Sequence, residues 1–502
     1  MANYFNLIDE PWITVADEGK VSLKALFNNN GYRSLGGSPV QKISMMKLLL
    51  AIAQAACTPK DDKDWKQLGS QGMTIRCLDY LDKWHDRFYL YGDKPFLQIP
   101  AIKAAAKQSF GAVLPEVSTG NTTVLTQSQV EQPLADADKA LLLVFLMAFA
   151  LGGKKTDNKI VLADGYRGKF NDKGKPSTGK PGPAIAHMGL LHNFCLGKFV
   201  QQTLWLNLLT RTDIQSCGYY PIGIGTAPWQ DMPVSEDCET ARSLKNSLMG
   251  RLVPLSRFCL LADDGLHYSE GIVHASYLES VVDPTVSVNF NLTKPKVLWV
   301  NPEKRPWREL IALLGFFQQQ SSGFNCLQLK LSTARAAHNV ESFAIWSGGL
   351  KVSSNAGEQY VSGSNDIVES VTWLSSSALG ERWFQQLKTE MEGMEIVSKT
   401  LYGCTAAFYK QQLKDGSDRA AQSTGQYWQF CERDIQSLVD SCDDLNNPDV
   451  SSQQRHLLRC RFADYAQRAY DRFCPKQTAR QIDAWAKCRP NFTKYLKKQE
   501  VL

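Results

Sequence analysis

The last quarter of the chain carries the pattern that most limits what the protein can fold into. Apolar residues recur there at helical spacing in four segments, 378–413, 420–444, 452–473 and 477–498. The segments are separated at Asp415-Gly416, at Asn446-Asn447-Pro448 and at Pro475, and these residue types end helices. Four amphipathic helices joined by short loops predict an up-down four-helix bundle.

The preceding residues mix two kinds of pattern. Ser44–Ala56 is apolar on most faces, which predicts a buried helix, while alternation between about 218 and 300 predicts strands and hairpins. Residues 325–363 are expected to form strands joined by a Gly/Ser-rich turn. We therefore predict an α+β fold, with a mixed α/β body over 1–370 and a four-helix bundle over 371–502.

Composition excludes several classes of protein. The thirteen cysteines contain no C-x-x-C pair and the seven histidines are dispersed, so neither a disulfide framework nor a zinc site is expected. The apolar run at 140–151 is 12 residues long, whereas a membrane span needs about 20. No secretion signal opens the sequence. These features predict a cytoplasmic protein without a cofactor, a metal or a membrane partner.

Positive charge is concentrated in two segments. The formal net charge of the whole chain is only +6, but residues 152–180 hold eight basic and three acidic residues. Their first four residues, Gly152, Gly153, Lys154 and Lys155, follow a buried helix. Glycines let the backbone approach a partner closely, and lysines neutralise phosphates. A flexible solvated loop explains the glycines equally well, but the basic excess favours nucleic-acid contact.

The second segment, 453–502, holds twelve basic and four acidic residues. Arg461, Arg468 and Arg472 recur there at spacings of seven and four, which places them on one face of a helix. We expect this face to contact a DNA backbone or an acidic partner.

Catalytic motifs are weak. Residues 174–180 match the start of a phosphate-binding loop, G-x-x-x-x-G-K, but Pro181 stands where Ser or Thr would bind magnesium. No nucleophile elbow, zinc-protease motif or nuclease acid pair is present. The sequence thus favours a non-enzymatic protein. The alternative is a nucleotide-dependent enzyme, which would be supported if the chain hydrolysed ATP and Lys180→Ala abolished that activity.

Four collinear blocks resemble one family. FNLIDEPWITV at 5–15, AIAQAACTPKDDKDW at 51–65, KPFLQIP at 94–100 and GQYWQFCERDIQSLV at 425–439 are similar to the CasA family, the large subunit of the type I-E CRISPR Cascade complex. The resemblance implies a non-catalytic subunit that recognises the protospacer-adjacent motif in double-stranded DNA and helps to open the duplex. It also implies a role in antiviral defence and several partners: guide RNA, the backbone, handle-binding and small Cascade subunits, and a recruited helicase–nuclease.

The resemblance also assigns three groups of residues. The family's glycine loop, which approaches the DNA motif, falls on Gly152 and Gly153 with Lys154 and Lys155 beside it. The duplex-opening wedge falls on a turn between Gly348 and Asn355, and the loop that reaches the guide-RNA handle falls near 121–127. The wedge candidates are Gly349, Lys351, Ser353, Ser354 and Asn355, and the handle candidates are Asn121, Thr123, Leu125 and Gln127.

Two positions depart from the family pattern. Ser354 stands where a relative carries the longer glutamine, and Asn355 is adjacent to it. A lysine that reads the motif in a relative has no counterpart near 262–268, so its contact is either lost or supplied by Arg251 or Arg257. A structural scaffold that contacts guide RNA only remains the competing hypothesis, and it predicts that Gly153→Asp leaves the affinity for duplex DNA unchanged.

Overall fold

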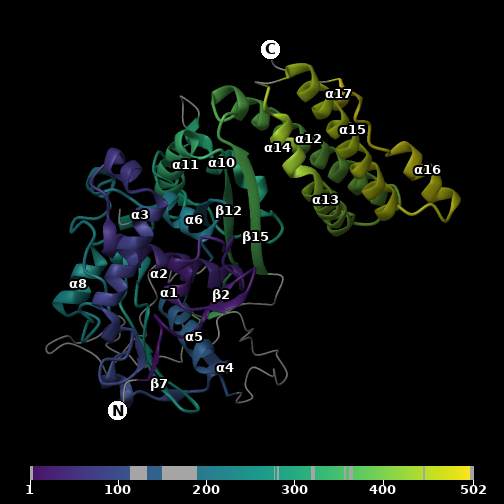
Figure 1. The fold of residues 1–502 in the computed structure, drawn as a ribbon. Coiled ribbons are helices and arrows are strands. Elements are labelled where there is room, and N and C mark those ends of the chain that lie inside the picture. The colour runs from purple at the N-terminus through teal and green to yellow at the C-terminus, as the bar shows by residue number, and fades with distance from the viewer. Residues whose placement is uncertain are drawn as a thin grey trace. The chain divides into compact units, whose positions relative to one another are not determined.

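The computed structural model describes residues 4–113, 133–149, 189–275, 277–279, 282–317, 323–355, 358–360, 366–444 and 447–497 (Figure 1). The chain divides into two compact units, Met1–Pro306 with Gly323–Val371, and Trp307–Ser322 with Thr372–Leu502. The predicted body placed residues 307–322 in the first unit, which is wrong. Trp307 packs against Trp428 with ring centroids 5.8 Å apart, and Arg308 pairs with Glu395 at 2.7 Å, so this segment belongs with the helices of the second unit.

A buried helix forms the centre of the first unit. Helix α2 (Pro39–Cys57) starts at a capping box between Ser38 and Gln41, with proline in its first turn. It packs against α3 (Asp62–Lys83), α5 (Asp136–Ala148) and α6 (Val200–Asn207). By length and composition α2 could cross a membrane, but 78% of its most apolar window is buried inside the structure, as in the core helix of a globular unit. The predicted buried helix at Ser44–Ala56 is confirmed.

Small sheets surround this helix. Two long strands, β15 (Ile367–Ser375) and β12 (Ser342–Leu350), form a sheet with β6 (His192–Leu196) in the order β15, β12, β6, and β12 pairs with β6 in antiparallel register from Ala344↔Leu196 to Gly348↔His192 (Figure 1). A second sheet joins β5 (Lys107–Gln108) to the hairpin of β7 (Arg257–Ala262) and β8 (Gly265–Glu270).

The prediction of strands across 325–363 is only partly right. Its first third is helix α11 (Leu327–Asn339), which buries Leu329, Ser332, Thr333 and Ala336 at helical spacing. Gly348 and Gly349 do not form a turn, because both lie buried inside β12. A Cβ atom at Gly348 would lie 2.6 Å from the Trp346 ring, so this glycine serves close packing and not chain reversal.

The second unit is helical, as predicted. Its long helices are α12 (Glu381–Lys410), α13 (Ser417–Cys431) and α15 (Pro448–Phe473), which contact one another (Figure 1). The predicted second helix is interrupted by a 3₁₀ turn before α14 (Ile435–Ser441). The predicted fourth helix is two short ones, α16 (Ala479–Lys487) and α17 (Thr493–Leu496), because Pro490 between them cannot donate a helical hydrogen bond. A continuous four-helix bundle is therefore not confirmed.

Candidate nucleic-acid interface

Two of the predicted nucleic-acid elements fall outside the described residues. These are the glycine loop with Gly152, Gly153, Lys154 and Lys155, and the handle loop with Asn121, Thr123, Leu125 and Gln127. The 174–180 segment lies outside them too. The structure does describe the residues on either side of the glycine-loop segment, and these define where that segment leaves and rejoins the first unit.

The chain enters the glycine-loop segment at Phe149 and returns from it at Gly189. Phe149 is buried and caps α5, and its ring meets the His192 ring edge-on with centroids 5.8 Å apart. Gly189 has a φ of +104°, which favours glycine. The Trp299 ring lies 3.3 Å from where a Cβ atom of Gly189 would stand, so a side chain there would be crowded as well as strained.

The base of the wedge hairpin lies against the same residues. A Cβ atom at Gly349 would lie 2.8 Å from the Leu190 carbonyl oxygen and 2.6 Å from Val300 Cγ2, so only glycine allows β12 to pass this close. The Gly189 carbonyl accepts a hydrogen bond from the Val300 amide at 2.6 Å. We call Gly189, Leu190, Val300 and Gly349 the shared root, since the described chain resumes at Gly189 and continues toward the hairpin after Gly349.

The hairpin itself consists of β13 (Ser353–Asn355) and β14 (Glu358–Tyr360). Its register pairs Ser354 with Gln359 and Asn355 with Glu358, so the chain reverses after Asn355. The predicted wedge began too early, because Gly349 is a buried strand residue. Lys351 is exposed at the base, where its amide donates to the Asp366 carbonyl at 2.8 Å, and Ser353 is half-buried.

A buried ion pair is connected to the shared root through strand β6. Lys47 on α2 and Asp283 have fully buried side chains and form an ion pair. Asp283 also accepts hydrogen bonds from the Thr285 amide and hydroxyl at 2.9 and 2.7 Å, and that hydroxyl is 2.8 Å from His192 Nδ1. His192 lies in β6, two residues after Leu190 of the shared root.

Burial and charge set the protonation of this network. Burial is the main cause that lowers the pKa of Lys47, to about 8, against the opposing Asp283 carboxylate. Burial alone would raise the pKa of Asp283, but the Lys47 ammonium and its hydrogen bonds hold that pKa below the usual value. Burial lowers the pKa of His192 to about 3, so its imidazole is neutral at pH 7.

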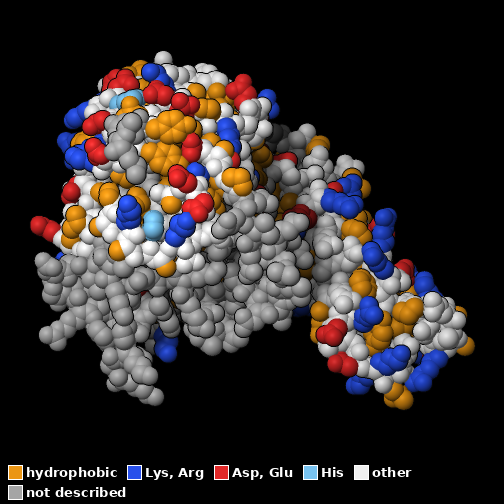
Figure 2. Space-filling view, turned by 90° about the horizontal axis from the view of Figure 1, so that it is seen from below, with side chains coloured by type: hydrophobic (Ala, Val, Ile, Leu, Met, Phe, Trp, Pro, Cys, Tyr) orange, Lys and Arg blue, Asp and Glu red, His pale blue; other side chains and the backbone are white. Residues whose placement is uncertain are grey.

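The arginines predicted to face DNA lie on α15 and are exposed, but each already has a partner. Arg461 forms an ion pair with Asp434, Arg468 pairs with Asp464 at 2.7 Å, and Arg472 donates to Gln426 at 2.7 Å. Figure 2 shows Lys and Arg of the helical unit interspersed with acidic and apolar side chains. The positive face is therefore weaker than the sequence predicts, and its contact with DNA stays a prediction.

Comparison with known proteins identifies the family. The family model of the CRISPR-associated protein Cse1 matches residues 6–469. The chain belongs to the Cse1 family. A curated relative, CRISPR-associated protein CasA/Cse1 of Thermus thermophilus, is 29% identical over 343 residues, which span 62% of this chain and 60% of the relative. This Cse1-family chain thus matches less than two thirds of that relative's length.

Solved structures show the same fold. The crystal structure of Thermus thermophilus CasA superposes with a TM-score of 0.73 at 21% identity and covers 98% of this chain and 99% of that one. The structure of a CRISPR RNA-guided surveillance complex contains a chain that superposes with a TM-score of 0.65 at 15% identity, covering 97% of this chain and 98% of that one. The resemblance seen in the sequence blocks is confirmed at the level of family and fold.

Of the two alternatives for the missing family lysine, replacement by Arg251 or Arg257 does not fit this Cse1-family chain, which leaves loss of the contact. The side chains of Arg251 and Arg257 are buried in the first unit, where Arg251 donates to the Ala275 carbonyl at 3.2 Å and Arg257 donates to the Tyr268 hydroxyl at 3.1 Å. Because both side chains are buried, neither arginine can contact a DNA duplex in this structure.

Sequence reasoning also missed Trp299. This large aromatic residue is 47% exposed and lies against Gly189 of the shared root. A single exposed apolar side chain is common on protein surfaces, so contact of Trp299 with nucleic acid stays a prediction. No sequence signal distinguished Trp299, which lies at the end of the alternating stretch between about 218 and 300.

Proposed function

We propose that this chain is the non-catalytic large subunit of a type I-E CRISPR surveillance complex. In this role it recognises the protospacer-adjacent motif in double-stranded DNA, helps to open the duplex for guide-RNA pairing and recruits the helicase–nuclease. One structural observation supports the proposal within the Cse1 family: Gly189 and Leu190, where the described chain resumes after the segment that holds Gly152 and Gly153, pack against Val300 and against Gly349 at the base of the hairpin.

The shared root supports a division of labour between the two elements. Lys154 and Lys155 would neutralise phosphates beside the motif, and Gly152 and Gly153 would let the backbone approach the groove. The hairpin would insert next to the motif and separate the first base pairs. Because Leu190, just after the segment that holds Gly152 and Gly153, lies against Gly349 at the base of the hairpin, the two elements would act on the same duplex.

Partners follow from the same role. The loop with Asn121, Thr123, Leu125 and Gln127 would contact the guide-RNA handle, and the remaining surface would contact the backbone, handle-binding and small subunits. Sequence specificity beyond the motif would come from base pairing with the guide RNA. The complex would act in the cytoplasm, in antiviral defence, and this subunit would need no cofactor.

The deciding experiment compares assembled guide-RNA complexes with and without this chain. Each is titrated at fixed salt against duplex targets that carry a randomised flanking trinucleotide. We expect tight binding that requires the chain and selects particular flanks. If both samples bound the duplex with equal affinity whatever the flanking trinucleotide, motif recognition by this chain would be refuted.

Variants then locate the recognition. Gly153→Asp places a carboxylate against phosphates and should weaken duplex binding by about tenfold or more. Gly403→Asp is the matched control, because Gly403 is exposed on α12 and a Cβ atom there meets nothing within 4 Å. Unchanged affinity in Gly153→Asp would favour the scaffold hypothesis.

A further inference from the structure

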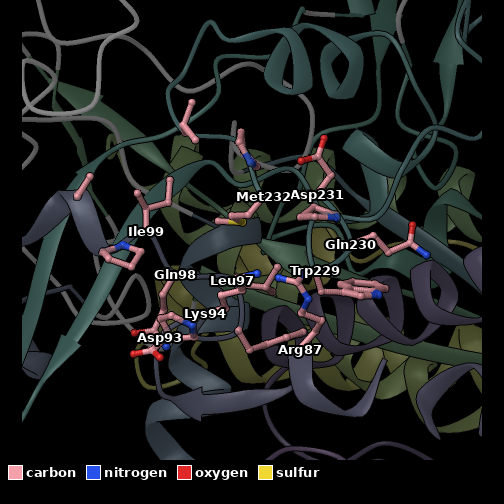
Figure 3. Close-up of a pocket in the computed structure, with 17 residues that line it drawn as sticks. Arg87, Asp93, Lys94, Leu97, Gln98, Ile99, Trp229, Gln230, Asp231 and Met232 are labelled. Atoms are coloured by element: carbon pink, nitrogen blue, oxygen red, sulfur yellow. The ribbon is translucent and has the colours of Figure 1, made fainter. Parts of the chain in front are cut away.

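A pocket of about 370 Å³ lies in the first unit between two irregular chain segments (Figure 3). One wall is the segment 93–101, which leads from β4 (Tyr89–Tyr91) into the 3₁₀ helix at Pro100–Ala104, and the other is the segment 228–234. Neither wall contains a residue assigned above to nucleic acid. A volume of this size is sufficient for one large side chain with its neighbouring backbone.

The interior of the pocket is apolar and its polar groups are already satisfied. Trp229 is 4% exposed, stacks on Phe96 with centroids 6.0 Å apart, and donates its indole N–H to the Tyr80 hydroxyl at 2.8 Å. The Gln98 amide donates to the Leu90 carbonyl at 2.7 Å and accepts from the Leu261 amide at 2.8 Å. Four of the lining residues are prolines, which have no N–H to offer: Pro95, Pro100, Pro228 and Pro233.

Leu97 shows that the wall is held in an unfavourable conformation. Its φ is +54°, in the left-handed region that costs an L-residue roughly 1–2 kcal/mol, yet its side chain is 5% exposed and lines the pocket. Backbone strain of this kind concentrates at binding sites, where the surroundings over-determine it.

A cation at the pocket lacks a counter-ion. Arg87 is half-buried, and its guanidinium has no hydrogen bond or ion pair to any of the residues that the structure describes. Lys94, on the same side in Figure 3, is exposed, but the exposed Asp93 beside it also lines the pocket and offsets its charge. Asp231 lies on the opposite side and accepts a hydrogen bond from Thr240 at 2.9 Å. A half-buried guanidinium is best compensated by a carboxylate, which it can bind through two hydrogen bonds.

The apolar surface also continues beyond the mouth of the pocket. Val234 is 73% exposed, and Pro100 and Ala101 are exposed on the other wall. A ligand that covers these residues as well as the interior must be longer than a single small molecule of the pocket's volume.

We propose that this pocket binds an extended segment of a partner protein, which places one large apolar side chain over Trp229 and an adjacent acidic residue on Arg87. The proposal does not rest on DNA recognition, because no residue of the shared root contributes to it.

The test uses the full chain and a displayed library of randomised seven-residue peptides. Selection on the unaltered chain should enrich peptides with Leu, Phe or Trp next to Asp or Glu. The enriched peptides are then synthesised, and their affinity is measured by fluorescence anisotropy for the chain and its variants.

Two variants probe the two halves of the site. Arg87→Glu should weaken binding of the enriched peptides by about tenfold or more, since it removes a charge-assisted pair and adds repulsion. Ala101→Trp fills the mouth and should weaken binding to a similar extent. Lys103→Glu is the matched control, because Lys103 is exposed in the same 3₁₀ helix but does not line the pocket, and it should change the affinity less than threefold.

The outcomes separate this proposal from the function proposed above. Enriched peptides without an acidic residue, or equal affinity for the unaltered chain and Arg87→Glu, would overturn it, as would selection that enriches no peptide at all. Thermal unfolding of each variant verifies that the chain is folded. Flank-dependent DNA binding should be unchanged in Arg87→Glu, so a failure of DNA recognition would leave the peptide result standing.

Discussion

Removing the ammonium group of Lys47 is the sharpest test of how the first unit is held together beneath the shared root. In Lys47→Met the Asp283 carboxylate remains fully buried and loses its only cationic partner among the described residues, while it keeps the two hydrogen bonds from Thr285. Methionine has about the volume of lysine, so no cavity term is expected. The loss should therefore resemble that of a broken buried ion pair, about 3–5 kcal/mol of unfolding free energy.

A second variant separates the charge from the packing. In Lys47→Met/Asp283→Asn the uncompensated charge is gone, and the asparagine oxygen still accepts from Thr285, so most of the lost stability should return. The single variant should also recover stability as the pH falls. Without the ammonium, burial raises the pKa of Asp283 in the folded state, so folding takes up a proton and is favoured at lower pH.

Urea unfolding followed by tryptophan fluorescence measures these free energies. Arg459→Met is the comparison in the second unit, because Arg459 forms a buried ion pair with Glu390 there, with a further hydrogen bond of 2.9 Å. The reasoning is refuted if Lys47→Met costs less than about 1 kcal/mol, or if the double variant is as unstable as the single one.

Three further predictions follow from the same contacts. His192 and His274 are buried with pKa values lowered to about 3 by burial, against 6.5 when unfolded, so stability should be lost as the pH falls from 6.5 toward 3, by about 1.4 kcal/mol per pH unit for each histidine. Urea titrations at several pH values should show a smaller acid slope in His274→Gln than in the unaltered chain. Gly349→Val puts a Cβ atom within 2.6–2.8 Å of its neighbours and should lower the free energy of unfolding by about 1–3 kcal/mol. An unchanged free energy would contradict the close approach described for the shared root. Trp299→Ala should weaken flank-dependent DNA binding by about fivefold or more with little change in thermal stability, and equal binding would assign Trp299 a packing role only.

The elements that the sequence predicted well are those whose signal is local. Helix α2 follows from the apolar run Ser44–Ala56, although its capping serine and first-turn proline lie upstream of the predicted start, and α12 follows from one amphipathic pattern that continues over 30 residues. Both patterns can be recognised without knowing what the helix packs against. Family membership was predicted for a similar reason, because collinear blocks need no knowledge of contacts.

The wedge turn was misplaced for the opposite reason. The pair Gly348-Gly349 resembles a turn when only its neighbours along the chain are considered. In the structure these glycines admit the Trp346 ring, the Leu190 carbonyl and Val300, and the last two lie far away in sequence. A glycine that serves packing cannot be distinguished from a glycine that serves a turn until the opposing strand is known.

The basic C-terminal segment shows the same limit in electrostatic form. The count over 453–502 gives a local net charge of +8, but three of its arginines are paired with acids from outside the segment. Arg455, Arg459 and Arg461 pair with Asp444, Glu390 and Asp434, and the first two arginines are buried. A charge held in an ion pair releases fewer counterions from DNA than an unpaired one, so these residues would add little to the salt dependence of binding. Unless the partner acids are displaced, the electrostatic part of DNA recognition should rest mainly on the first unit, where the two candidate elements share a root.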